Sequence, residues 1–484
     1  MRVKSNQEML TIVHTNDLHS HFEAMPRIAQ MIQDERHSTT EHMLVFDIGD
    51  HMDRMALETE GSKGQANIDV MNLMNYDAVT IGNNEGLTFT AEMLEQAYAG
   101  LTCPVVCCNI HEAHTELPPL WMNRHVLLQK GSIRFGVIGA TAPYPDFYDL
   151  LGWTVLDPLE SIRSQVEQIR SEVDLIVILS HLGLPTDKEL AMHVPGIDLI
   201  LGGHTHHLLE KSLVVGETTL AAAEKFGHYL GKVILQKNNL TGQAYIVSGQ
   251  SIPVVAGPED ILVKQSIAMH REQAMVQMNH TVAITNHVLS IDYNVESPFP
   301  NLLAQAVRRF TQSEISLVNS GQLLGELHQG DITERDLHAL CPSPINPCRM
   351  YLKGEDILYS LEQSLLPEFT QKVIYGFGFR GKVLGGIAVD GIEVLYDPLA
   401  PPYERILEVS LQGVPLQKEK EYIVGTLDMF TFGIGYERLK QGTQREYILP
   451  EFLRDLLRLE LQIPGAVEAS YLERWIPKNK CEFM

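Results

Sequence analysis

Histidine, aspartate and asparagine side chains follow the ends of several apolar runs in the first half of the chain. One run, "LILGG", ends directly before His204 and His206, which are two residues apart. Other runs end in the same kinds of residue, and the complete set is Asp17, His19, Asp50, Asn83, His181, His204 and His206. Imidazole and carboxylate ligands together suit Mn, Zn or Fe better than Ca. The set therefore predicts a metal centre.

The number of these side chains predicts two divalent metal ions. Seven ligands exceed what one ion needs, and aspartates in a partly dry cleft need cations to stay charged. Two ions that share one carboxylate would satisfy them. Each motif also has an ordinary alternative, since a lone "GD" is common and His181 after "VILS" could be a core histidine. The ordered set of strand ends favours the metal centre.

The elements that would position these residues are short β-rich runs that alternate with helical stretches between residues 10 and 250. "MLVFDIGD" and "DLIVILSH" are apolar on both faces, and "PLESIRSQVEQIRSEV" is amphipathic with helical spacing. This pattern indicates α/β layering with largely buried strands. Ligands of such folds bind in the crevice at the carboxyl ends of the strands, so we expect the seven side chains to meet there.

The length of 484 residues is too great for one hydrophobic core and predicts two domains. We predict a catalytic domain over residues 8–255 and a second domain of mixed α/β character over residues 288–476. Residues 256–287 would connect them. Within this connection, residues 257–279 have a proline near their start and then neither glycine nor proline, which predicts a linker helix.

The composition restricts the partners and the location. A net charge of −24 argues against a nucleic acid or an anionic membrane as the main partner, although metal ions or arginines can still attract an anionic substrate. The sequence shows no apolar stretch long enough for a signal peptide or a membrane span, so we expect a cytoplasmic location. The six cysteines form no CxxC pair and are expected to be free thiols. A monomer or a homodimer is expected.

The motifs resemble those of the calcineurin-like metallophosphoesterases, and the 5'-nucleotidase branch fits best. In order, the first-domain motifs are Asp17-x-His19, Gly49-Asp50, Gly82-Asn83-x-Glu85, Ser180-His181 and Gly203-His204-Thr205-His206. In the second domain, "ESPFPNLLAQA", "LVNSGQLLGELHQGDIT" and "GIGYERL" are similar to further segments of that branch. The resemblance implies a four-layer α-β-β-α catalytic domain followed by a mixed α/β 5'-nucleotidase-type domain.

The resemblance also implies a role for each ligand. One metal ion would be held by Asp17, His19, Asp50 and His206. The other would be held by Asp50, Asn83, His181 and His204, so that Asp50 bridges the two. A water between two such ions ionises near neutral pH and attacks phosphorus in line, while the ions hold the phosphoryl oxygens. The catalytic residues expected from the resemblance are Asp50, His181 and the residue at position 84.

The third motif departs from the family pattern, because "GNNE" has Asn84 where the family has a histidine. Leu87 stands where the supporting aspartate of that histidine is expected. Asparagine can donate a hydrogen bond but cannot transfer a proton near neutral pH. Loss of a general acid costs about 10² to 10⁴ in rate, mainly on poor leaving groups. We therefore expect a preference for anhydrides or activated phosphates, unless Glu85 or His207 replaces the donor.

The second domain departs as well. "NSGQLLG" keeps Asn319 and Gly321 but has Leu323 and Leu324 where a phosphate-contacting arginine is expected. Asp428 lies where a base-stacking phenylalanine is expected, and "GIGY" has Ile434 in place of an aspartate. An arginine beside aromatic rings could replace these contacts, and the candidates are Arg349, Arg380, Phe377, Phe379, Phe430 and Phe432. The alternative is that these rings are core residues and the arginines are solvated.

The sequence thus predicts a dinuclear-metal hydrolase that acts on phosphate esters of nucleotides or related small molecules. A nucleotide pyrophosphatase or phosphodiesterase, acting on nucleotide-sugars, cyclic nucleotides or dinucleotides, is the alternative enzyme. A catalytically weak, metal-binding ligand sensor is the alternative outside the enzymes. The changes at Asn84 and Leu87 favour the sensor, whereas retention of all seven presumed ligands favours an enzyme.

Overall fold

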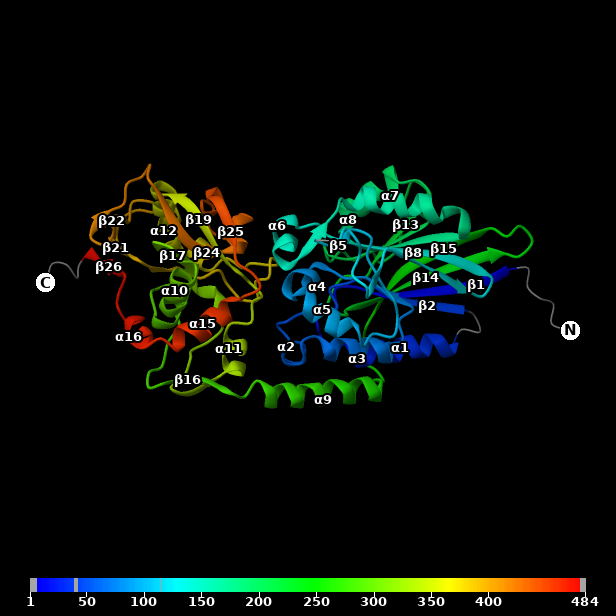
Figure 1. Ribbon diagram of the computed structural model, residues 1–484, viewed down its shortest axis with the longest axis horizontal. Coiled ribbons are helices and arrows are strands. Elements are labelled where there is room, and N and C mark those ends of the chain that lie inside the picture. Colours follow the sequence, from blue (N-terminus) through cyan, green and yellow to red (C-terminus); the bar gives the residue numbers. More distant parts are fainter. Residues whose placement is uncertain (1–6, 39–41, 114, 479–484) are drawn as a thin grey trace. The chain divides into compact units, whose positions relative to one another are not determined.

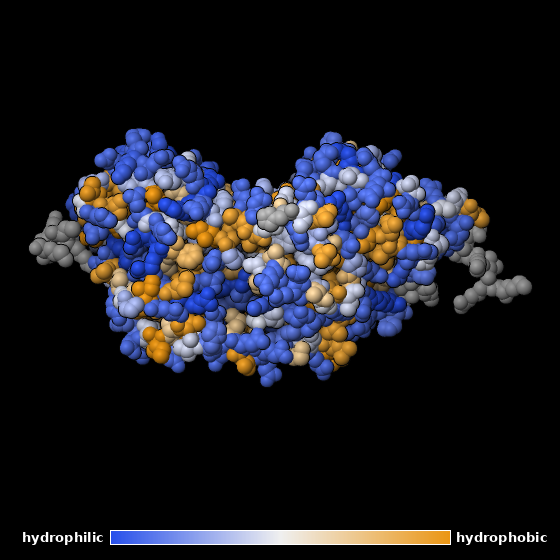
Figure 2. Space-filling view, in the orientation of Figure 1, coloured by the Kyte–Doolittle hydropathy of each residue, from blue (hydrophilic) through white to orange (hydrophobic). Residues whose placement is uncertain are grey.

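The computed structural model describes residues 7–38, 42–113 and 115–478. By its internal contacts the chain divides into two compact units, Met1–Ala274 and Met275–Met484 (Figure 1). On the face that Figure 2 shows, hydrophilic residues predominate and hydrophobic ones form separate patches. None of the helices in the described ranges combines the length and the apolar composition that a bilayer crossing requires.

The described part of the first unit contains two large sheets. In the first sheet the strand order is β15 (Ala244–Pro253), β14 (Tyr229–Asn238), β1 (Gln7–Thr15), β2 (His42–Asp47), β3 (Ala78–Val79), β4 (Val105–Val106), β6 (Met122–Asn123). In the second it is β12 (Leu213–Val215), β13 (Thr218–Ala222), β11 (Leu199–Gly202), β10 (Leu175–His181), β8 (Ile133–Thr141), β7 (His125–Lys130). The central strands of both sheets are parallel. Antiparallel strands lie at one edge of the first sheet and at both edges of the second. A small third sheet pairs β5 (Ile110–Glu112) with β9 (Trp153–Val155).

The two large sheets pack face to face and are covered by helices on their outer faces. One apolar cluster joins Ile12 and Phe46 of the first sheet to Val137 and Val177 of the second. The opposite side chains of β8 and β10 pack in another cluster with Ile162 of α7. The helices are α1 (Met25–Ser38), α2 (Leu57–Ser62), α3 (Gln65–Met74), α4 (Asn83–Thr88), α5 (Ala91–Tyr98), α6 (Pro145–Tyr148), α7 (Pro158–Ile169) and α8 (Leu184–His193). In Figure 1, α1 and α3 lie on one side of the strands and α7 and α8 on the other.

The sequence explains these layers. Every residue of β10 is buried, as expected for a parallel strand that is covered on both faces. α7 begins at Pro158 directly after Asp157, whose carboxylate accepts a hydrogen bond from Glu160 N–H and so caps the helix. The predicted α/β layering of the first half of the chain is confirmed.

The second unit has its own core and three sheets in its described part. The strand order of the first is β20 (Ile387–Asp390), β17 (Ile315–Asn319), β24 (Glu421–Leu427), β19 (Pro347–Lys353), β25 (Thr443–Tyr447). The strand order of the second is β23 (Val414–Pro415), β22 (Ile406–Leu411), β21 (Ile392–Tyr396), β26 (Trp475–Pro477). The third pairs β16 (Thr281–Thr285) with β18 (Gly330–Thr333). Its helices are α10 (Pro298–Phe310), α11 (Glu334–Leu340), α12 (Gly354–Ser364), α13 (Pro367–Thr370), α14 (Asp428–Thr431), α15 (Leu453–Leu461) and α16 (Ala466–Ala469). The mixed α/β character predicted for this part of the chain is confirmed.

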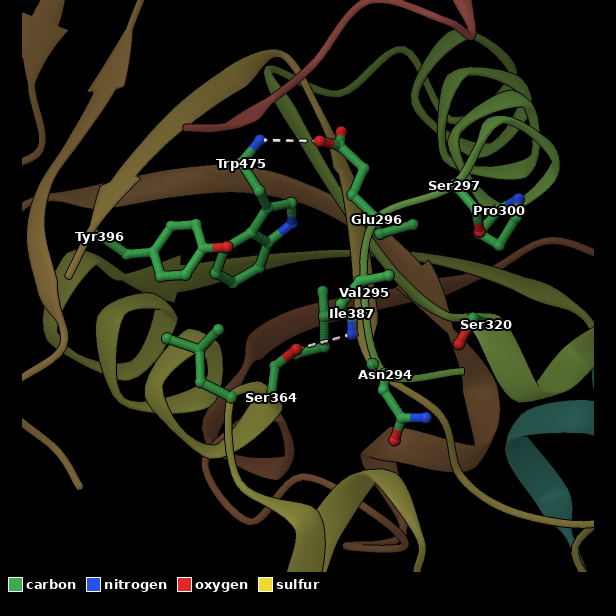
Figure 3. Close-up of a pocket in the computed structure, with 13 residues that line it drawn as sticks. Asn294, Val295, Glu296, Ser297, Pro300, Ser320, Ser364, Ile387, Tyr396 and Trp475 are labelled. Carbon is green, nitrogen blue, oxygen red and sulfur yellow. Dashed lines mark hydrogen bonds between the residues drawn. The ribbon is translucent and has the colours of Figure 1, made fainter. Parts of the chain in front are cut away.

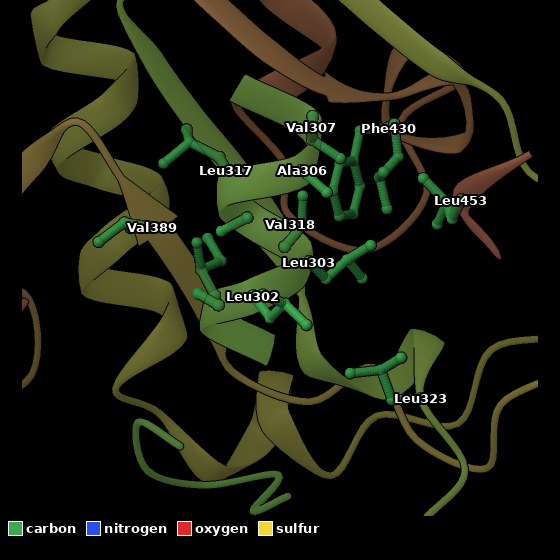
Figure 4. Packing of buried hydrophobic residues seen from close by; sticks show 14 of the residues in the cluster. Leu302, Leu303, Ala306, Val307, Leu317, Val318, Leu323, Val389, Phe430 and Leu453 are labelled. Carbon is green, nitrogen blue, oxygen red and sulfur yellow. The ribbon is translucent and has the colours of Figure 1, made fainter. Parts of the chain in front are cut away.

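Helix α10 is the centre of the second core. Leu302, Leu303 and Val307 of α10 pack against Leu317 of β17 and Leu453 of α15 (Figure 4). All nine residues from Phe299 to Val307 are buried, so this helix is covered on all sides for most of its length. Burial of each large apolar side chain contributes about 1.5 to 3 kcal/mol, which makes α10 a main source of this unit's stability.

The helix predicted within residues 257–279 is α9 (Ile261–Gln277). Up to Ala274 it belongs to the first unit. His270 Nε2 lies 2.7 Å from Asp69 Oδ2, and Arg271 Nε donates to Glu58 Oε1 over 2.6 Å. This helix therefore packs against the first unit over most of its length.

The cysteines form no disulfide in the described part of the chain. Cys103, Cys107, Cys108, Cys341 and Cys348 are free thiols, as the sequence predicts. Cys481 lies outside the described residues.

Candidate metal centre

The predicted metal ligands follow strands of both large sheets in the first unit. Asp17 and His19 follow β1, Asp50 follows β2, His181 ends β10, and His204 and His206 follow β11. Asn83 is the first residue of α4, a short distance after β3. The loops bond to one another, since Asp17 N–H donates to Gly49 O over 3.0 Å and His19 N–H donates to Asp50 O over 2.8 Å.

Five of these residues adopt a left-handed backbone conformation that is uncommon for residues other than glycine. The φ angles are 51° for Asp17, 47° for His19, 51° for Asp50, 71° for His204 and 55° for His206. Such conformations cost about 1 to 3 kcal/mol each and cluster at functional sites.

A first group of possible ligands consists of Asp17, His19 and His206. Asp17 Oδ1 lies 3.4 Å from His206 Nε2, and the two Nε2 atoms of His19 and His206 are 3.3 Å apart. His19 Nε2 also lies 3.7 Å from Asp50 Oδ2. Two imidazole nitrogens and a carboxylate oxygen thus converge on one point, as metal coordination requires.

A second group consists of Asp17, Asp50 and His181, all of them buried. His181 Nε2 lies 3.3 Å from Asp50 Oδ2. His181 Nδ1 lies 2.7 Å from Ile48 O and donates a hydrogen bond to it, so Nε2 is the nitrogen that faces the carboxylates and would bind a cation in place of a proton. Neither His181 Nε2 nor the buried Asn83 Oδ1 has a hydrogen-bond partner among the described residues. Since buried polar atoms are normally satisfied, these two atoms fit a metal ion.

The electrostatics of the centre favour cations. Burial alone would lower the pKa of His181, but the charges of Asp50 and Asp17 outweigh it and raise this pKa to about 10. Burial opposes ionisation of Asp50, yet His181 and His19 hold its pKa well below the usual range. Burial and then the charge of His181 lower the pKa of His204 to about 4, so this imidazole is neutral and can act as a ligand.

His204 lies at the edge of the cluster. Its ring centroid is 5.3 Å from that of His181, and its backbone N–H donates to Asp17 Oδ1 over 3.0 Å. Its Nε2 is 3.4 Å from the hydroxyl oxygen of Tyr144, a residue of the loop between β8 and α6. The strand-end pattern did not single out Tyr144, because it stands three residues beyond the end of β8.

Asn84, the residue at the position of the family histidine, lies beside His19. Its backbone N–H donates to Asp50 Oδ1 over 2.8 Å, and its side-chain Nδ2 lies 2.6 Å from His19 Nδ1. Asp53 Oδ2 lies 3.5 Å from both His19 Nδ1 and Asn84 Nδ2. The sequence reasoning missed Asp53, although its place three residues after Asp50 was visible.

The two residues that could have replaced the missing donor have other partners. Glu85 is buried, and its carboxylate accepts hydrogen bonds from the backbone N–H groups of Asp50, Met52 and Gly82, at 3.0, 2.8 and 2.8 Å. Burial and the charge of Asp50 raise the pKa of Glu85 to about 7. His207 is exposed, and its Nδ1 lies 2.8 Å from Thr205 Oγ1. Glu85 thus connects the loops that carry Asp50 and Asn83.

The predicted aromatic residues of the second unit divide into two pairs. Phe379 is 4% and Phe430 is 0% exposed, and both belong to the apolar core. Phe377 is 52% and Phe432 is 44% exposed, and their ring centroids are 5.7 Å apart. The placement of the first pair favours the alternative that they are core residues, whereas the second pair is partly exposed at the surface.

The remaining predicted substrate-binding residues have structural contacts. Asn319 is buried and donates from Nδ2 to Leu384 O over 2.6 Å. Gly321 has no room for a side chain, because an added Cβ would overlap the carbonyl oxygen of Val383. Arg349 is partly exposed, with NH1 3.7 Å from Glu446 Oε2, and Arg380 NH1 donates to Phe379 O over 3.4 Å.

A pocket of the second unit at the start of α10 contains none of the predicted substrate-binding residues (Figure 3). Glu296 lines it, and its carboxylate accepts a hydrogen bond from Trp475 N–H over 3.0 Å. The first three residues of α10 offer no N–H group to a ligand, since Pro298 and Pro300 have none and Phe299 N–H donates to Ser290 O over 3.1 Å. A phosphate group would meet a carboxylate there, so this pocket does not suit the phosphoryl group of a substrate.

The fold and the ligand cluster together define a metallophosphoesterase. Residues 10–208 match the calcineurin-like phosphoesterase family and residues 277–441 match the 5'-nucleotidase C-terminal domain. The chain belongs to the metallophosphoesterases that carry this second domain, and it is a hydrolase of phosphoric esters. The resemblance stated from the motifs and the two-domain α/β fold are confirmed.

Three comparisons give the particular relatives. The chain is 38% identical, over 94% of its own length and 99% of the relative, to the uncharacterized metallophosphoesterase YunD of Bacillus subtilis. It is 23% identical to the 5'-nucleotidase of Rattus norvegicus, over 95% of this chain and 90% of that protein. Its fold is similar to the structure of a putative 5'-nucleotidase from Staphylococcus aureus, with a TM-score of 0.69, 17% identity, and coverage of 97% and 100% of the two chains.

Proposed function

We propose that the protein hydrolyses phosphate esters of nucleotides or related small molecules with a dinuclear metal centre. The observation that carries this proposal is the convergence of Asp17, Asp50 and three imidazoles into two groups that have Asp17 in common. The 5'-nucleotidases among the relatives support a nucleotide as the substrate. The comparisons do not favour the pyrophosphatase or the ligand sensor as alternatives.

The metal ligands are proposed as the family pattern gives them. Asp17, His19, Asp50 and His206 would hold one ion, and Asp50, Asn83, His181 and His204 would hold the other. The position of Asp50 Oδ2, 3.7 Å from His19 Nε2 and 3.3 Å from His181 Nε2, supports a bridging role. Nitrogen and oxygen ligands in this mixture suit Mn, Zn or Fe. Two such ions, when bound, supply an ionised water and hold the phosphoryl oxygens.

The residues around the ligands position them. The carbonyl of Ile48 holds the Nδ1 proton of His181, so that Nε2 faces the centre. The carboxylate of Asp53 lies 3.5 Å from Nδ1 of His19, and Nε2 is the ring nitrogen on the side of Asp50 and His206. Asn84 also contacts His19, and it cannot protonate a leaving group. We therefore propose that substrates with good leaving groups are hydrolysed faster than nucleoside monophosphates.

The nucleobase is proposed to bind in the second unit at the exposed pair Phe377 and Phe432. Aromatic faces that remain exposed can stack on a base, and stacking contributes about 1 to 3 kcal/mol. We also propose a cytoplasmic location and a monomeric or homodimeric state.

A substrate panel with defined metals tests the proposed function. The purified protein is stripped of metal, loaded with Mn, Zn, Fe or Co, and assayed with AMP, ADP and p-nitrophenyl phosphate, while its metal content is measured. His181→Ala should lose one bound ion and activity, whereas His193→Ala, an exposed histidine of α8, should keep both. Absence of phosphatase activity with every metal, or full activity of His181→Ala, contradicts the proposal.

A further inference from the structure

Tyr144 is a polar residue beside the proposed metal ligands to which neither the family pattern nor the proposed function gives a role. It precedes α6 and is the N-cap residue of this short helix. Its hydroxyl oxygen lies 3.4 Å from His204 Nε2, and the two rings meet edge to face with centroids 6.3 Å apart. The side chain is partly exposed.

The packing of α6 fixes Tyr144 next to the helix that carries Asn83 and Asn84. α6 contacts α4, and the ring of Tyr148 lies against Gly86 so closely that an added Cβ there would overlap the tyrosine. Phe147 and Tyr148 are buried and anchor α6. Packing of α6 on α4 therefore fixes the position of Tyr144, whose hydroxyl lies beside His204.

The hydroxyl hydrogen of Tyr144 cannot be accepted by His204 once that histidine holds a metal ion. If Nε2 binds the ion, its lone pair is used. If Nδ1 binds the ion, Nε2 carries the ring proton and is itself a donor. A tyrosine hydroxyl keeps its hydrogen near neutral pH. In both cases the O–H group next to His204 is left to donate to a ligand of the metal centre.

We propose that the Tyr144 hydroxyl donates a hydrogen bond to a non-bridging oxygen of the phosphoryl group during its transfer. This inference rests on the proposed phosphohydrolase function. The Asn84 side-chain amide lies against the ring of His19, with Nδ2 2.6 Å from Nδ1. A donor aimed at the phosphoryl oxygens stabilises the negative charge that they carry in the transition state. No proton is transferred, so the expected preference for good leaving groups remains.

The test compares two changes of the same kind in the metal-loaded protein. Tyr144→Phe removes only the hydroxyl group beside His204. Tyr98→Phe is the matched control, because it removes the hydroxyl of a buried tyrosine of α5 in the same unit, whose ring stacks on Trp121. For Tyr144→Phe we expect kcat to fall about 10² to 10³-fold on AMP and on p-nitrophenyl phosphate, as for loss of one oxyanion donor. The control should stay close to the wild-type protein.

Two further readouts separate this contact from a structural role. Metal content should be unchanged in Tyr144→Phe. Its affinity for tungstate, a phosphate-like anion without a leaving group, should fall about tenfold in calorimetry, as expected for one hydrogen bond to a charged group. Unchanged kcat and tungstate affinity would overturn the inference, and so would loss of metal together with activity. Failure of the proposed function has another signature, namely a wild-type protein that is inactive with every metal.

Discussion

Asn84 contacts two of the proposed ligands at once. Its backbone N–H donates to Asp50 Oδ1, and its side-chain nitrogen lies next to His19 Nδ1, so it helps to position both of these proposed ligands. The carboxylate of Asp53 is 3.5 Å from the same side-chain nitrogen. A residue at position 84 that could carry a proton would therefore have a carboxylate partner already in place.

Replacement of this asparagine tests the leaving-group argument. Asn84→His should raise kcat for AMP by about 10²-fold, because an imidazole paired with Asp53 can protonate the ribose oxygen as it departs. Turnover of p-nitrophenyl phosphate, whose leaving group needs no proton, should change little. Asn84→Ala is the control and should improve neither substrate. An equal gain on both substrates would refute the argument.

For single residues of the second unit, the sequence alone did not predict which side chains are buried. Phe377, Phe379, Phe430 and Phe432 occur in similar polar and glycine-rich surroundings, yet the first and last are exposed and the other two are buried. Burial depends on which elements cover a position, and neighbouring residues do not specify this. Tyr144 was missed for a related reason, since packing of α6 on α4 brings it to the centre.

At the scale of elements, Glu85 connects the loop after β2 to the start of α4. Its two carboxylate oxygens accept three backbone N–H groups, from Asp50, Met52 and Gly82. The same two segments approach so closely that a Cβ at Gly82 would overlap Asp50 Oδ1. The metal centre therefore depends on close contact between the backbone of one loop and the side chain of the other.

A methyl group at this contact should disrupt the centre. Gly82→Ala is expected to displace Asp50 and to lower metal content and activity together, by at least about tenfold. Gly100→Ala is a suitable control in the same unit, because the nearest atom to its added Cβ is the end of the Gln65 side chain, 3.3 Å away. Metal analysis and kcat on p-nitrophenyl phosphate check both variants. Normal metal content in Gly82→Ala would contradict this account of the loop contact.

The start of α14 predicts a pH dependence of stability. Burial raises the pKa of Asp428 well above its ordinary value, to about 7, and hydrogen bonds such as that from Asn346 N–H, at 3.2 Å, offset this only in part. The folded state thus binds the proton more tightly than the unfolded state. Stability should fall as the pH rises from the unfolded pKa to about 7 and then stay constant.

Asp428→Asn removes this titration and keeps an oxygen that can accept the Asn346 hydrogen bond. In urea unfolding, the variant should be more stable than the wild-type protein at about pH 8, by on the order of 1 kcal/mol or more, and the difference should shrink toward about pH 4. A difference that is independent of pH would mean that Asp428 has the same pKa in the folded and the unfolded state, which contradicts the prediction.

At the scale of the whole molecule, the two units have separate hydrophobic cores, and the proposed ligands all lie in the first. A ligand that binds only the folded state stabilises the unit to which it binds. In calorimetry we expect two transitions, of which chelation lowers only one, by several degrees. Asp428→Asn at about pH 8 should raise the other transition. If chelation lowers both transitions equally, the units unfold together.

The sequence predicted the class of fold and singled out the candidate ligands, because buried strands and the residues at their ends are visible as local sequence patterns. Buried strands such as β10 are continuous apolar runs, and the ends of parallel strands meet at one place. The sequence indicated the boundary between the two units less clearly. Residues 257–279 do form a helix, but its contacts with Asp69 and Glu58 depend on tertiary packing, which no local pattern reports.

The left-handed backbone at Asp17, His19, Asp50, His204 and His206 has one more consequence. The unfavourable torsion angles are imposed when the polypeptide folds, so the metal-binding site has its shape before a metal ion binds. Metal ions should then bind to and dissociate from a preformed, rigid site, and one metal ion can be exchanged for another without refolding of the loops. Far-ultraviolet circular dichroism should be the same for the stripped and the loaded protein, while their thermal stabilities differ.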